Sequence, residues 1–223
     1  MLTLGIDDSG RGPVIGPMVL AGCLINSDLE SEFKNKGIKD SKQLTRKRRD
    51  ILADVIKSKA ETFEIIIVHP IEIDGSNAEG TNLNDLEAIT AAEIINRINK
   101  GTTKIKVVID CPSPNIGKWR DFLKTKIKDL SNLEIVCEHK ADINHIPVSA
   151  ASILAKTTRD FEIEKIKDKI KENFGSGYAS DPITLDFLNK HALKYQDAGI
   201  FRHTWSTWKT AIAGKEQKKI GEF

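Results

Sequence analysis

Hydrophobic residues along this chain occur in short runs and at helical spacing, and together they predict alternating strands and helices. Runs rich in β-branched residues predict strands at 2–7, 18–25, 62–68, 106–110 and 133–139. Apolar residues three and four positions apart predict helices at 41–56, 83–98, 119–127, 148–173, 183–193 and 204–213. Three early strands followed by alternating helices and strands indicate an α/β fold with a mixed central sheet, plus a C-terminal helical segment.

The longest predicted helix, at 148–173, changes character along its length. Its first part, VSAASILAK, is almost entirely small or apolar, as expected where a helix packs closely on a sheet. Its later part carries charged residues around an apolar stripe. We expect Phe161, Ile163, Ile166 and Ile170 to form that stripe, on a part of the helix that extends away from the main core.

Composition places the chain among globular proteins. Its 223 residues are 39% hydrophobic and 30% charged, enough for one sizeable core with a small appendage. No stretch approaches the roughly 18 apolar residues that a membrane-spanning helix needs. Cys23, Cys111 and Cys137 lie far apart among apolar neighbours, which predicts buried thiols and neither a disulfide framework nor a zinc site. We therefore expect a cytoplasmic monomer that does not enter a membrane.

The net charge of +2 is small, but positive charge is concentrated in one segment. Residues 34–50 contain eight Lys and Arg side chains against Asp40 and Asp50. Such a block commonly forms a solvated helix face. It becomes a phosphate-binding surface only if a nucleic-acid site lies next to it.

Aspartates stand where predicted strands end. Asp7 and Asp8 close the first strand, Asp110 closes the fourth, and Asp142 follows the fifth. Single aspartates at strand ends often form turns or cap helices, so each alone has an ordinary structural explanation. In α/β proteins, however, ligands bind at the ends of strands. If the first and fourth strands are neighbours, these carboxylates lie close together.

Several carboxylates cannot remain ionised side by side without a counter-charge. A hard divalent cation such as Mg²⁺ supplies that charge and binds carboxylates, water and phosphate oxygens. Two such ions a few ångströms apart are the usual arrangement for in-line attack on a phosphodiester. The pattern of acidic residues thus favours metal-dependent phosphodiester chemistry.

Several ordered motifs resemble type 2 ribonuclease H (ribonuclease HII), in its archaeal-like single-chain form. In sequence order they are GIDDSGRGPVIGPMV from residue 5, KDSKQLT from 39, NLND from 82, VVID from 107, HKAD from 139, VSAASILAK from 148 and GSGYASDP from 175. The resemblance covers roughly residues 1–210 and implies a ribonuclease H-like α/β fold.

The resemblance implies an endoribonuclease that hydrolyses the RNA strand of RNA/DNA hybrids and cuts 5′ of single ribonucleotides embedded in duplex DNA. The products carry a 3′-hydroxyl and a 5′-phosphate, and the cofactors are two Mg²⁺ or Mn²⁺ ions. The implied catalytic metal ligands are Asp7, Asp8, Asp110 and Asp142. Such an enzyme takes part in DNA replication and repair.

The resemblance also implies substrate contacts. Gly10, Arg11 and Gly12 match a turn whose backbone approaches the ribose 2′-hydroxyl, which glycine allows and bulkier residues obstruct. Tyr178 matches a tyrosine that packs on the sugar after the ribonucleotide, and Lys42 matches a phosphate contact. With Lys42 inside it, the basic block becomes an expected duplex-binding face.

Two positions depart from the family pattern. The family pair is normally Asp-Glu followed by Ala, whereas this chain has Asp8 and Ser9. Asp8 is one methylene shorter than Glu, which brings metal preference and turnover into question. Ala179 stands where the family commonly has Pro, so the loop around Tyr178 is expected to be looser. Two rival functions remain. One is a catalytically weakened hybrid-binding module, which only Asp8 suggests; the other is another nuclease of the same superfold, against which the GRG turn and the Tyr178 loop argue.

We expect three parts along the chain: a catalytic domain at 1–174, a helical segment at 175–213 that contributes to the substrate site, and a flexible tail at 214–223. In the tail, Gln217, Ile220 and Phe223 have the spacing Q-x-x-[ILM]-x-x-F. This resembles the peptide with which replication enzymes bind the PCNA sliding clamp, although its usual second aromatic residue is missing. A lysine-rich solvated tail is the competing interpretation.

Overall fold

A mixed five-stranded sheet forms the centre of the α/β fold. The computed structural model describes residues 1–39 and 41–220, with the backbone alone for 215–220. The strands are β1 (Leu2–Ser9), β2 (Met18–Asn26), β3 (Thr62–Val68), β4 (Ile105–Asp110) and β5 (Leu133–Glu138). Their order in the sheet is β3-β2-β1-β4-β5, with β1 antiparallel to β2 and parallel to β4, and β4 parallel to β5. The predicted fold class is confirmed, and β1 and β4 are neighbours.

The helices follow the predicted order, with additions. Their bounds are α1 Ser27–Asn35, α2 Arg46–Lys59, α3 Pro70–Ala78, α4 Leu83–Ile98, α5 Ile116–Lys124, α6 Ala141–Asn144, α7 Ile146–Ile170, α8 Pro182–His191 and α9 Ser206–Ile220. The helix predicted at 41–56 is wrong at its start, because Ser41–Gln43 is a separate 3₁₀ turn. The Thr45 side chain then caps α2 by accepting a hydrogen bond from the Arg48 amide.

The chain forms two compact units, and each draws on separate segments of the sequence. The first contains Met1–Ser9, Val19–Ile67 and Asn82–Thr158. The second contains Gly10–Met18, Val68–Thr81 and Arg159–Phe223. The domain boundaries predicted at 174 and 213 stay predictions.

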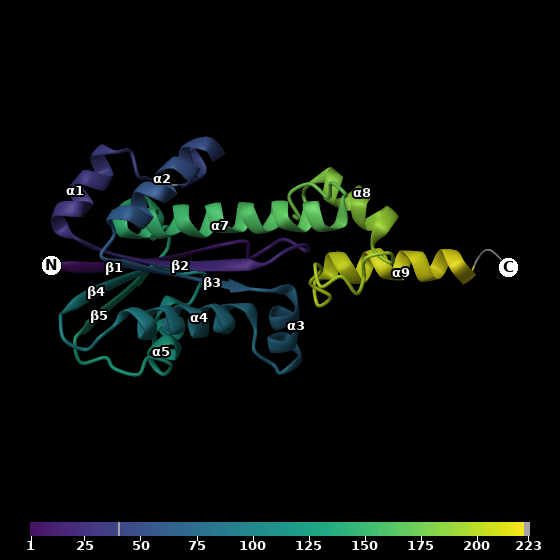
Figure 1. Cartoon of the computed structure of the whole chain (residues 1–223). Helices are drawn as coiled ribbons and strands as arrows, with labels where there is room; N and C mark the ends of the chain where they lie inside the picture. The colour runs from purple at the N-terminus through teal and green to yellow at the C-terminus, as the bar shows by residue number, and fades with distance from the viewer. Residues whose placement is uncertain (40, 221–223) are drawn as a thin grey trace. The chain divides into compact units, whose positions relative to one another are not determined.

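In the first unit, α1, α2 and α7 cover one face of the sheet (Figure 1). The core there is built from alternate residues of β2, among them Val19 and Cys23, packed against Leu52 of α2 and Leu154 of α7. At Gly5 the sheet and α7 approach so closely that a Cβ would lie only 2.1 Å from the backbone of Pro147. Glycine is therefore required at this point of β1.

The opposite face of the sheet is covered by α4 and α5, which lie together below the sheet in Figure 1. Trp119 of α5 donates its indole N–H to the Asn84 carbonyl of α4 at 2.8 Å. Ile94 and Ile98 of α4 are buried, whereas Ile89 is exposed.

The second unit has its own aromatic core. Phe187 packs against Phe174 and Phe201, with ring centroids 5.8 and 6.3 Å apart. The later part of α7 contributes Ile163, Ile166 and Ile170 to this core, as its predicted stripe requires. Phe161 does not belong to it: its ring is exposed, beneath the ammonium group of Lys165.

The three cysteines are free thiols. Cys23 and Cys111 are buried free thiols as predicted, and Cys137 is only half-buried, contrary to prediction. Burial raises the pKa of the Cys23 thiol to about 12.

Across the part of the chain that the structure describes, every helix is too short or too polar to span a membrane.

Candidate active site

Asp7 and Asp110 lie at the same edge of the sheet because β1 and β4 run parallel. Ile6 of β1 pairs with Ile109 of β4, so the residue that follows each of them comes next in register. Asp7 is almost fully buried, with 6% of its surface exposed, while Asp8 and Asp110 are half-buried. The structure therefore brings the first and fourth strand-end aspartates together, as the sequence predicts.

Asp7 sits in an electrostatic environment that disfavours its charge. Burial raises the pKa of this carboxyl group well above its usual value, and the nearby Asp8 and Asp110 carboxylates raise it further. Hydrogen bonds from the Ser152 hydroxyl and from the Asp8 amide, 2.8 Å from Asp7 Oδ1, act in the opposite direction. These bonds do not offset the burial and the repulsion.

Asp142 reaches the same edge through a short helix. The Ala141 amide at the start of α6 donates to Asp110 Oδ1 at 3.1 Å, which ties α6 to the end of β4. The Ser149 hydroxyl of α7 donates to the Asp142 carbonyl at 2.6 Å. Asp142 is buried and its backbone is thereby fixed.

Lys42 lies beside Asp142, with its Nζ 3.9 Å from Asp142 Oδ2. Lys42 belongs to the 3₁₀ turn Ser41–Gln43, and its side chain is 82% exposed. The preceding residue, Ser41, forms a buried hydrogen bond of 2.9 Å with Ser152. One short turn therefore contacts Asp142 directly and is connected to Asp7 through Ser152.

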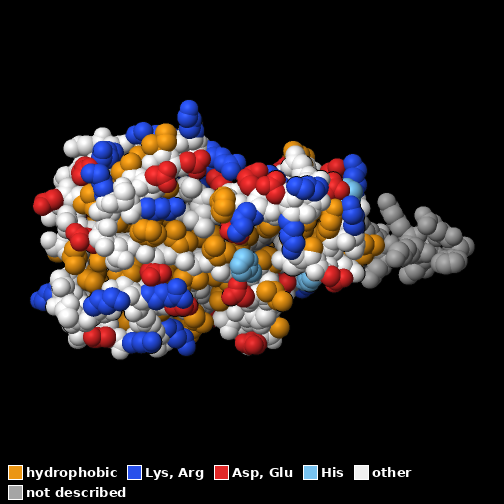
Figure 2. Space-filling view, in the orientation of Figure 1, with side chains coloured by type: hydrophobic (Ala, Val, Ile, Leu, Met, Phe, Trp, Pro, Cys, Tyr) orange, Lys and Arg blue, Asp and Glu red, His pale blue; other side chains and the backbone are white. Residues whose placement is uncertain are grey.

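The basic block around Lys42 serves more than one purpose. Arg48 donates to the Lys36 carbonyl at 2.6 Å, and Arg49 donates to the Leu44 carbonyl at 2.8 Å, so these two arginines stabilise local loops. Arg46 and Lys47 are exposed at the start of α2. Figure 2 shows Lys and Arg side chains along the upper edge of the view, where α2 lies.

The carboxylates suit a divalent cation by their chemistry. Their oxygens are hard ligands of the kind that Mg²⁺ and Mn²⁺ bind. After burial, repulsion from the Asp8 and Asp110 carboxylates contributes to the raised pKa of Asp7. Among the described residues, no three His, Cys, Asp or Glu side chains already stand in a metal-binding arrangement. The donor set fits the metal, and the repulsion between its members is what a bound cation relieves.

Sequence reasoning missed two residues beside the carboxylates. Glu87 of α4 and Trp119 of α5 line a small cavity together with Asp7, Asp8 and Asp110. Glu87 is buried, with 2% of its surface exposed. In the sequence, only its position two residues after the NLND motif could have suggested a role for Glu87. The packing of α4 on the sheet brings it to this site.

The glycine turn predicted to read the ribose belongs to the second unit. Gly10 has φ +88°, a left-handed conformation that favours glycine. A Cβ at Gly10 would lie 2.4 Å from Nε of Arg159, so glycine also makes room for that side chain. At Gly12 a Cβ would lie 3.6 Å from the Tyr178 ring, which places the turn beside the predicted sugar-packing tyrosine.

The loop that carries Tyr178 is held by hydrogen bonds within the second unit. The Gly177 carbonyl accepts from the Val14 amide at 2.8 Å, and the Asp181 side chain accepts from the Ser176 amide at 2.7 Å. The guanidinium of Arg159 lies 5.1 Å from the centroid of the Tyr178 ring. Burial lowers the pKa of Arg159, but arginine remains charged near neutrality because its pKa starts so high.

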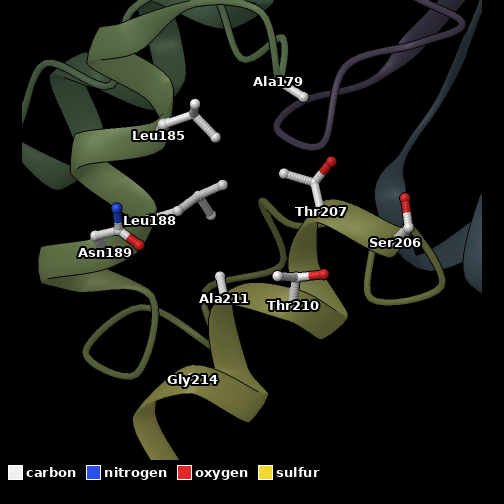
Figure 3. Close-up of a pocket in the computed structure, with 9 residues that line it drawn as sticks. All are labelled: Ala179, Leu185, Leu188, Asn189, Ser206, Thr207, Thr210, Ala211 and Gly214. Carbon is white, nitrogen blue, oxygen red and sulfur yellow. The ribbon is translucent and has the colours of Figure 1, made fainter.

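A cavity of about 360 Å³ also lies in the second unit, between α8 and α9 (Figure 3). Leu185 and Leu188 of α8 face Thr207 and Thr210 of α9 across it. Ala179, next to Tyr178, lies at its margin. None of the predicted site residues lines this cavity, so it is separate from the predicted chemistry.

The predicted clamp-binding tail falls largely outside the described structure. The backbone of α9 continues to Ile220, so Gln217 and Ile220 lie in a helix. Their side chains, and Phe223 altogether, lie outside the described residues. The tail assignment stays a prediction.

Comparison with known proteins identifies the family. The family model described as Ribonuclease HII matches residues 4–208. This chain belongs to the ribonuclease HII family. It is 40% identical to Ribonuclease HII of Methanococcus maripaludis over 225 residues, covering 100% of this chain and 92% of the relative. This excludes the rival assignment to another nuclease of the same superfold.

Two solved structures of archaeal ribonucleases have the same fold. Ribonuclease H2 from Pyrococcus horikoshii matches with a TM-score of 0.84 and 37% identity, covering 95% of this chain and 97% of that one. The PCNA:RNase HII complex from Archaeoglobus fulgidus matches with a TM-score of 0.80 and 34% identity, covering 92% and 96%. The ribonuclease HII fold thus extends over nearly all of this chain.

Proposed function

We propose that this chain hydrolyses the RNA strand of RNA/DNA hybrids and cuts 5′ of single ribonucleotides embedded in duplex DNA. The observation that carries the proposal is the meeting of Asp7 and Asp110 at one sheet edge, with Asp142 tied to the same edge through α6. Family membership supports ribonuclease H activity. The two-metal mechanism and the cut at single ribonucleotides are the finer parts of the proposal.

The proposed metal ligands are Asp7, Asp8, Asp110 and Asp142. Bound divalent ions, Mg²⁺ or Mn²⁺, would supply an activated water and stabilise charge on the scissile phosphate. Ser152 and the Asp8 amide orient the Asp7 carboxylate, and the Ala141 amide orients that of Asp110. The protein thereby fixes at least one oxygen of each of these two carboxylates, and their remaining oxygens would be available to the ions.

Lys42 is the proposed phosphate contact of the first unit. Its exposed ammonium group lies next to Asp142, where it can attract a backbone phosphate. The exposed Arg46 and Lys47 continue this positive surface along α2. Their binding would depend on salt, because phosphate contacts release condensed counterions.

Gly10, Arg11, Gly12 and Tyr178 are the proposed sugar-reading residues of the second unit. The closeness of the Tyr178 ring to Gly12 supports this assignment, since an aromatic face beside an exposed turn can pack on a sugar. Gly12 is exposed and carries no side chain, so a 2′-hydroxyl can approach the backbone there, whereas the space beside Gly10 is filled by Arg159. We propose 3′-hydroxyl and 5′-phosphate ends as the products.

We also propose that the tail binds a PCNA-type sliding clamp through Gln217, Ile220 and Phe223. The solved Archaeoglobus fulgidus relative is a PCNA:RNase HII complex, which supports such an interaction here. Ile220 and Phe223 are three positions apart in the sequence, a spacing that would put both on one face of a helical turn bound in an apolar groove.

A cleavage assay tests the central proposal. The substrates are an RNA/DNA hybrid, a DNA duplex with one ribonucleotide, and the same duplex without it, each with Mg²⁺, Mn²⁺ or chelator. We expect cleavage of the first two with either metal and none with chelator. Binding without cleavage in both metals would favour the rival hybrid-binding module, for which the shorter Asp8 is the one argument.

A further inference from the structure

Arg202 is a fully buried arginine, and it binds the backbone of the glycine turn. Its Nη2 donates to the Gly10 carbonyl and its Nη1 to the Arg11 carbonyl, both at 2.6 Å. Nη2 and Nε also donate to the Gly16 carbonyl, at 3.0 and 3.1 Å. One guanidinium group thus joins both ends of the turn.

The turn is held from the same side by further contacts within the second unit. Trp205 donates its indole N–H to the Gly12 carbonyl at 3.2 Å, and its ring lies 5.0 Å from the Arg202 guanidinium. The Arg202 amide donates to the Val14 carbonyl at 2.9 Å. The carbonyls of three successive residues, Gly10 to Gly12, therefore accept hydrogen bonds from Arg202 and Trp205.

This arrangement fixes the direction of the amide groups. In a trans peptide the N–H points opposite to the C=O of the same unit, and no peptide among the described residues is cis. The carbonyls of Gly10 and Arg11 point to Arg202, so the amides of Arg11 and Gly12 point away from it. A charged donor on the carbonyl also polarises the peptide and strengthens its N–H as a donor.

We propose that Arg202 is the positioning residue that sets ribose selectivity: by binding the carbonyls of Gly10 and Arg11, it turns the Arg11 and Gly12 amides toward a substrate oxygen. The substrate group is the 2′-oxygen of the ribonucleotide. Arg202 itself touches no substrate and acts through the turn. The inference rests on the proposed function, because it assumes that this turn reads the ribose.

Burial of a guanidinium supports a role beyond packing. Removing a charged group from water is costly, and it persists where several acceptors satisfy its donors. Arginine can reach two carbonyls at once through its planar fork, whereas the single ammonium group of lysine cannot match that geometry. The substitution Arg202→Lys would therefore keep the positive charge but would no longer hold the Gly10 and Arg11 carbonyls in the same orientation.

The experiment compares Arg202→Met and Arg202→Lys with the wild-type protein. The first readout is the ratio of Kd for an all-DNA duplex to Kd for the same duplex with one ribonucleotide, measured in chelator at fixed ionic strength. The second is kcat and KM for the ribonucleotide duplex in Mg²⁺. Phe187→Leu is the control, because it disturbs the core of the same unit without removing a hydrogen bond to the turn.

We expect the wild-type protein and Phe187→Leu to bind the ribonucleotide duplex several-fold more tightly than DNA. Arg202→Met should bring the ratio to about one, with kcat lowered at least about tenfold and KM changed less than about threefold. Arg202→Lys should give a Kd ratio and a kcat between those of the wild-type protein and Arg202→Met. If Arg202→Met does not fold, the comparison of Arg202→Lys with wild type is the test. The proposal is overturned if either Arg202 variant folds and keeps the wild-type ratio of the two Kd values.

The wild-type results separate this inference from the proposed function. Metal-dependent cleavage with a ratio near one in the wild-type protein would overturn ribose reading by the turn, and the role of Arg202 with it. Absence of cleavage in the wild-type protein would overturn the proposed function. Cleavage and discrimination that survive in Arg202→Lys and Arg202→Met would overturn the role of Arg202 alone.

Discussion

Ser41 Oγ lies 2.9 Å from Ser152 Oγ, and both side chains are buried. Ser152 also hydrogen-bonds the Asp7 carboxyl group and lowers its pKa. When Asp7 is ionised it can only accept, so Ser152 then donates to Asp7 and Ser41 donates to Ser152. The turn that presents Lys42 is therefore connected to Asp7 through two hydroxyl groups.

Ser152→Ala should weaken metal binding. Loss of this hydrogen bond raises the pKa of Asp7 further, so protons compete better with the cation at this carboxylate. We expect the Mg²⁺ concentration for half-maximal cleavage to rise several-fold, with stability lowered by about 1 kcal/mol. Metal titration at two pH values checks this, with a larger effect expected at the lower pH. Ser58→Ala, whose exposed hydroxyl bonds only within α2, is the control.

Asp7→Asn should abolish cleavage and raise stability in the absence of metal. The pKa of Asp7 is raised in the folded protein, so its ionised form disfavours folding once the pH exceeds the pKa of the unfolded chain. A neutral amide removes this cost at pH 7. We expect a Tm several degrees above wild type in chelator, and a smaller increase on adding Mg²⁺.

Asp110→Asn provides the comparison for Asp7→Asn. Asp110 is half-buried, so its loss should abolish cleavage with less gain in stability. Retention of more than about a tenth of the wild-type rate in either variant would contradict the metal-ligand assignment, since removing a ligand is expected to cost far more.

Asp8→Glu restores the usual family side chain. If the shorter Asp8 limits metal geometry, the variant should cleave faster in Mg²⁺, or lose a preference for Mn²⁺. Rates in each metal at saturating substrate measure this. Lower activity in both metals would mean that the surrounding site, including the buried Glu87, is adapted to aspartate.

Tyr178→Ala should impair cutting at a single embedded ribonucleotide by about tenfold or more, because the ring positions the sugar. Metal affinity should not change. Tyr178→Phe keeps the ring and should stay close to wild type. Unchanged cleavage by Tyr178→Ala would show that the proximity of this ring to Gly12 has no role in catalysis.

Deletion of 217–223 should remove binding to a PCNA-type clamp and leave cleavage of short free duplexes intact. Calorimetry with the full-length and the truncated protein measures this. Equal clamp affinity in both would refute the tail assignment. A full-length chain with Gln217 and Ile220 changed to Ala shows whether clamp binding depends on these side chains or only on the length of the tail. We expect this variant to bind the clamp weakly as well.

The sequence predicted the strand-end aspartates because strand periodicity and chain order depend on local residues. It missed α1, α3 and α6, which are short and carry few apolar residues: Phe33 is the one buried residue of α1, and α6 spans only Ala141–Asn144. It also merged the turn at Ser41 with α2, although Thr45 is a typical capping residue.

The remaining site residues depend on tertiary contacts that no local pattern reveals. Ser152 lies in an apolar run and reads as a small packing residue, yet its hydroxyl meets Asp7. Arg202 lies 192 residues from Gly10, and its contact is with backbone, which leaves no complementary side chain in the sequence. Polar partners of this kind are found only once the chain is folded.

The interleaving of the two units constrains how this protein can be dissected. Gly10–Met18 belongs with Arg159–Phe223, although it is flanked by segments of the other unit. A chain cut at residue 174 would retain this loop but lose Gly177 and Arg202, to which its backbone is bonded. Truncation there would expose unsatisfied carbonyls and apolar side chains such as Val14 and Ile15. A loss of activity in such a truncated chain would therefore not show that the catalytic residues lie in the deleted segment. To produce the second unit alone, residues 10–18 would have to be joined to the C-terminal segment.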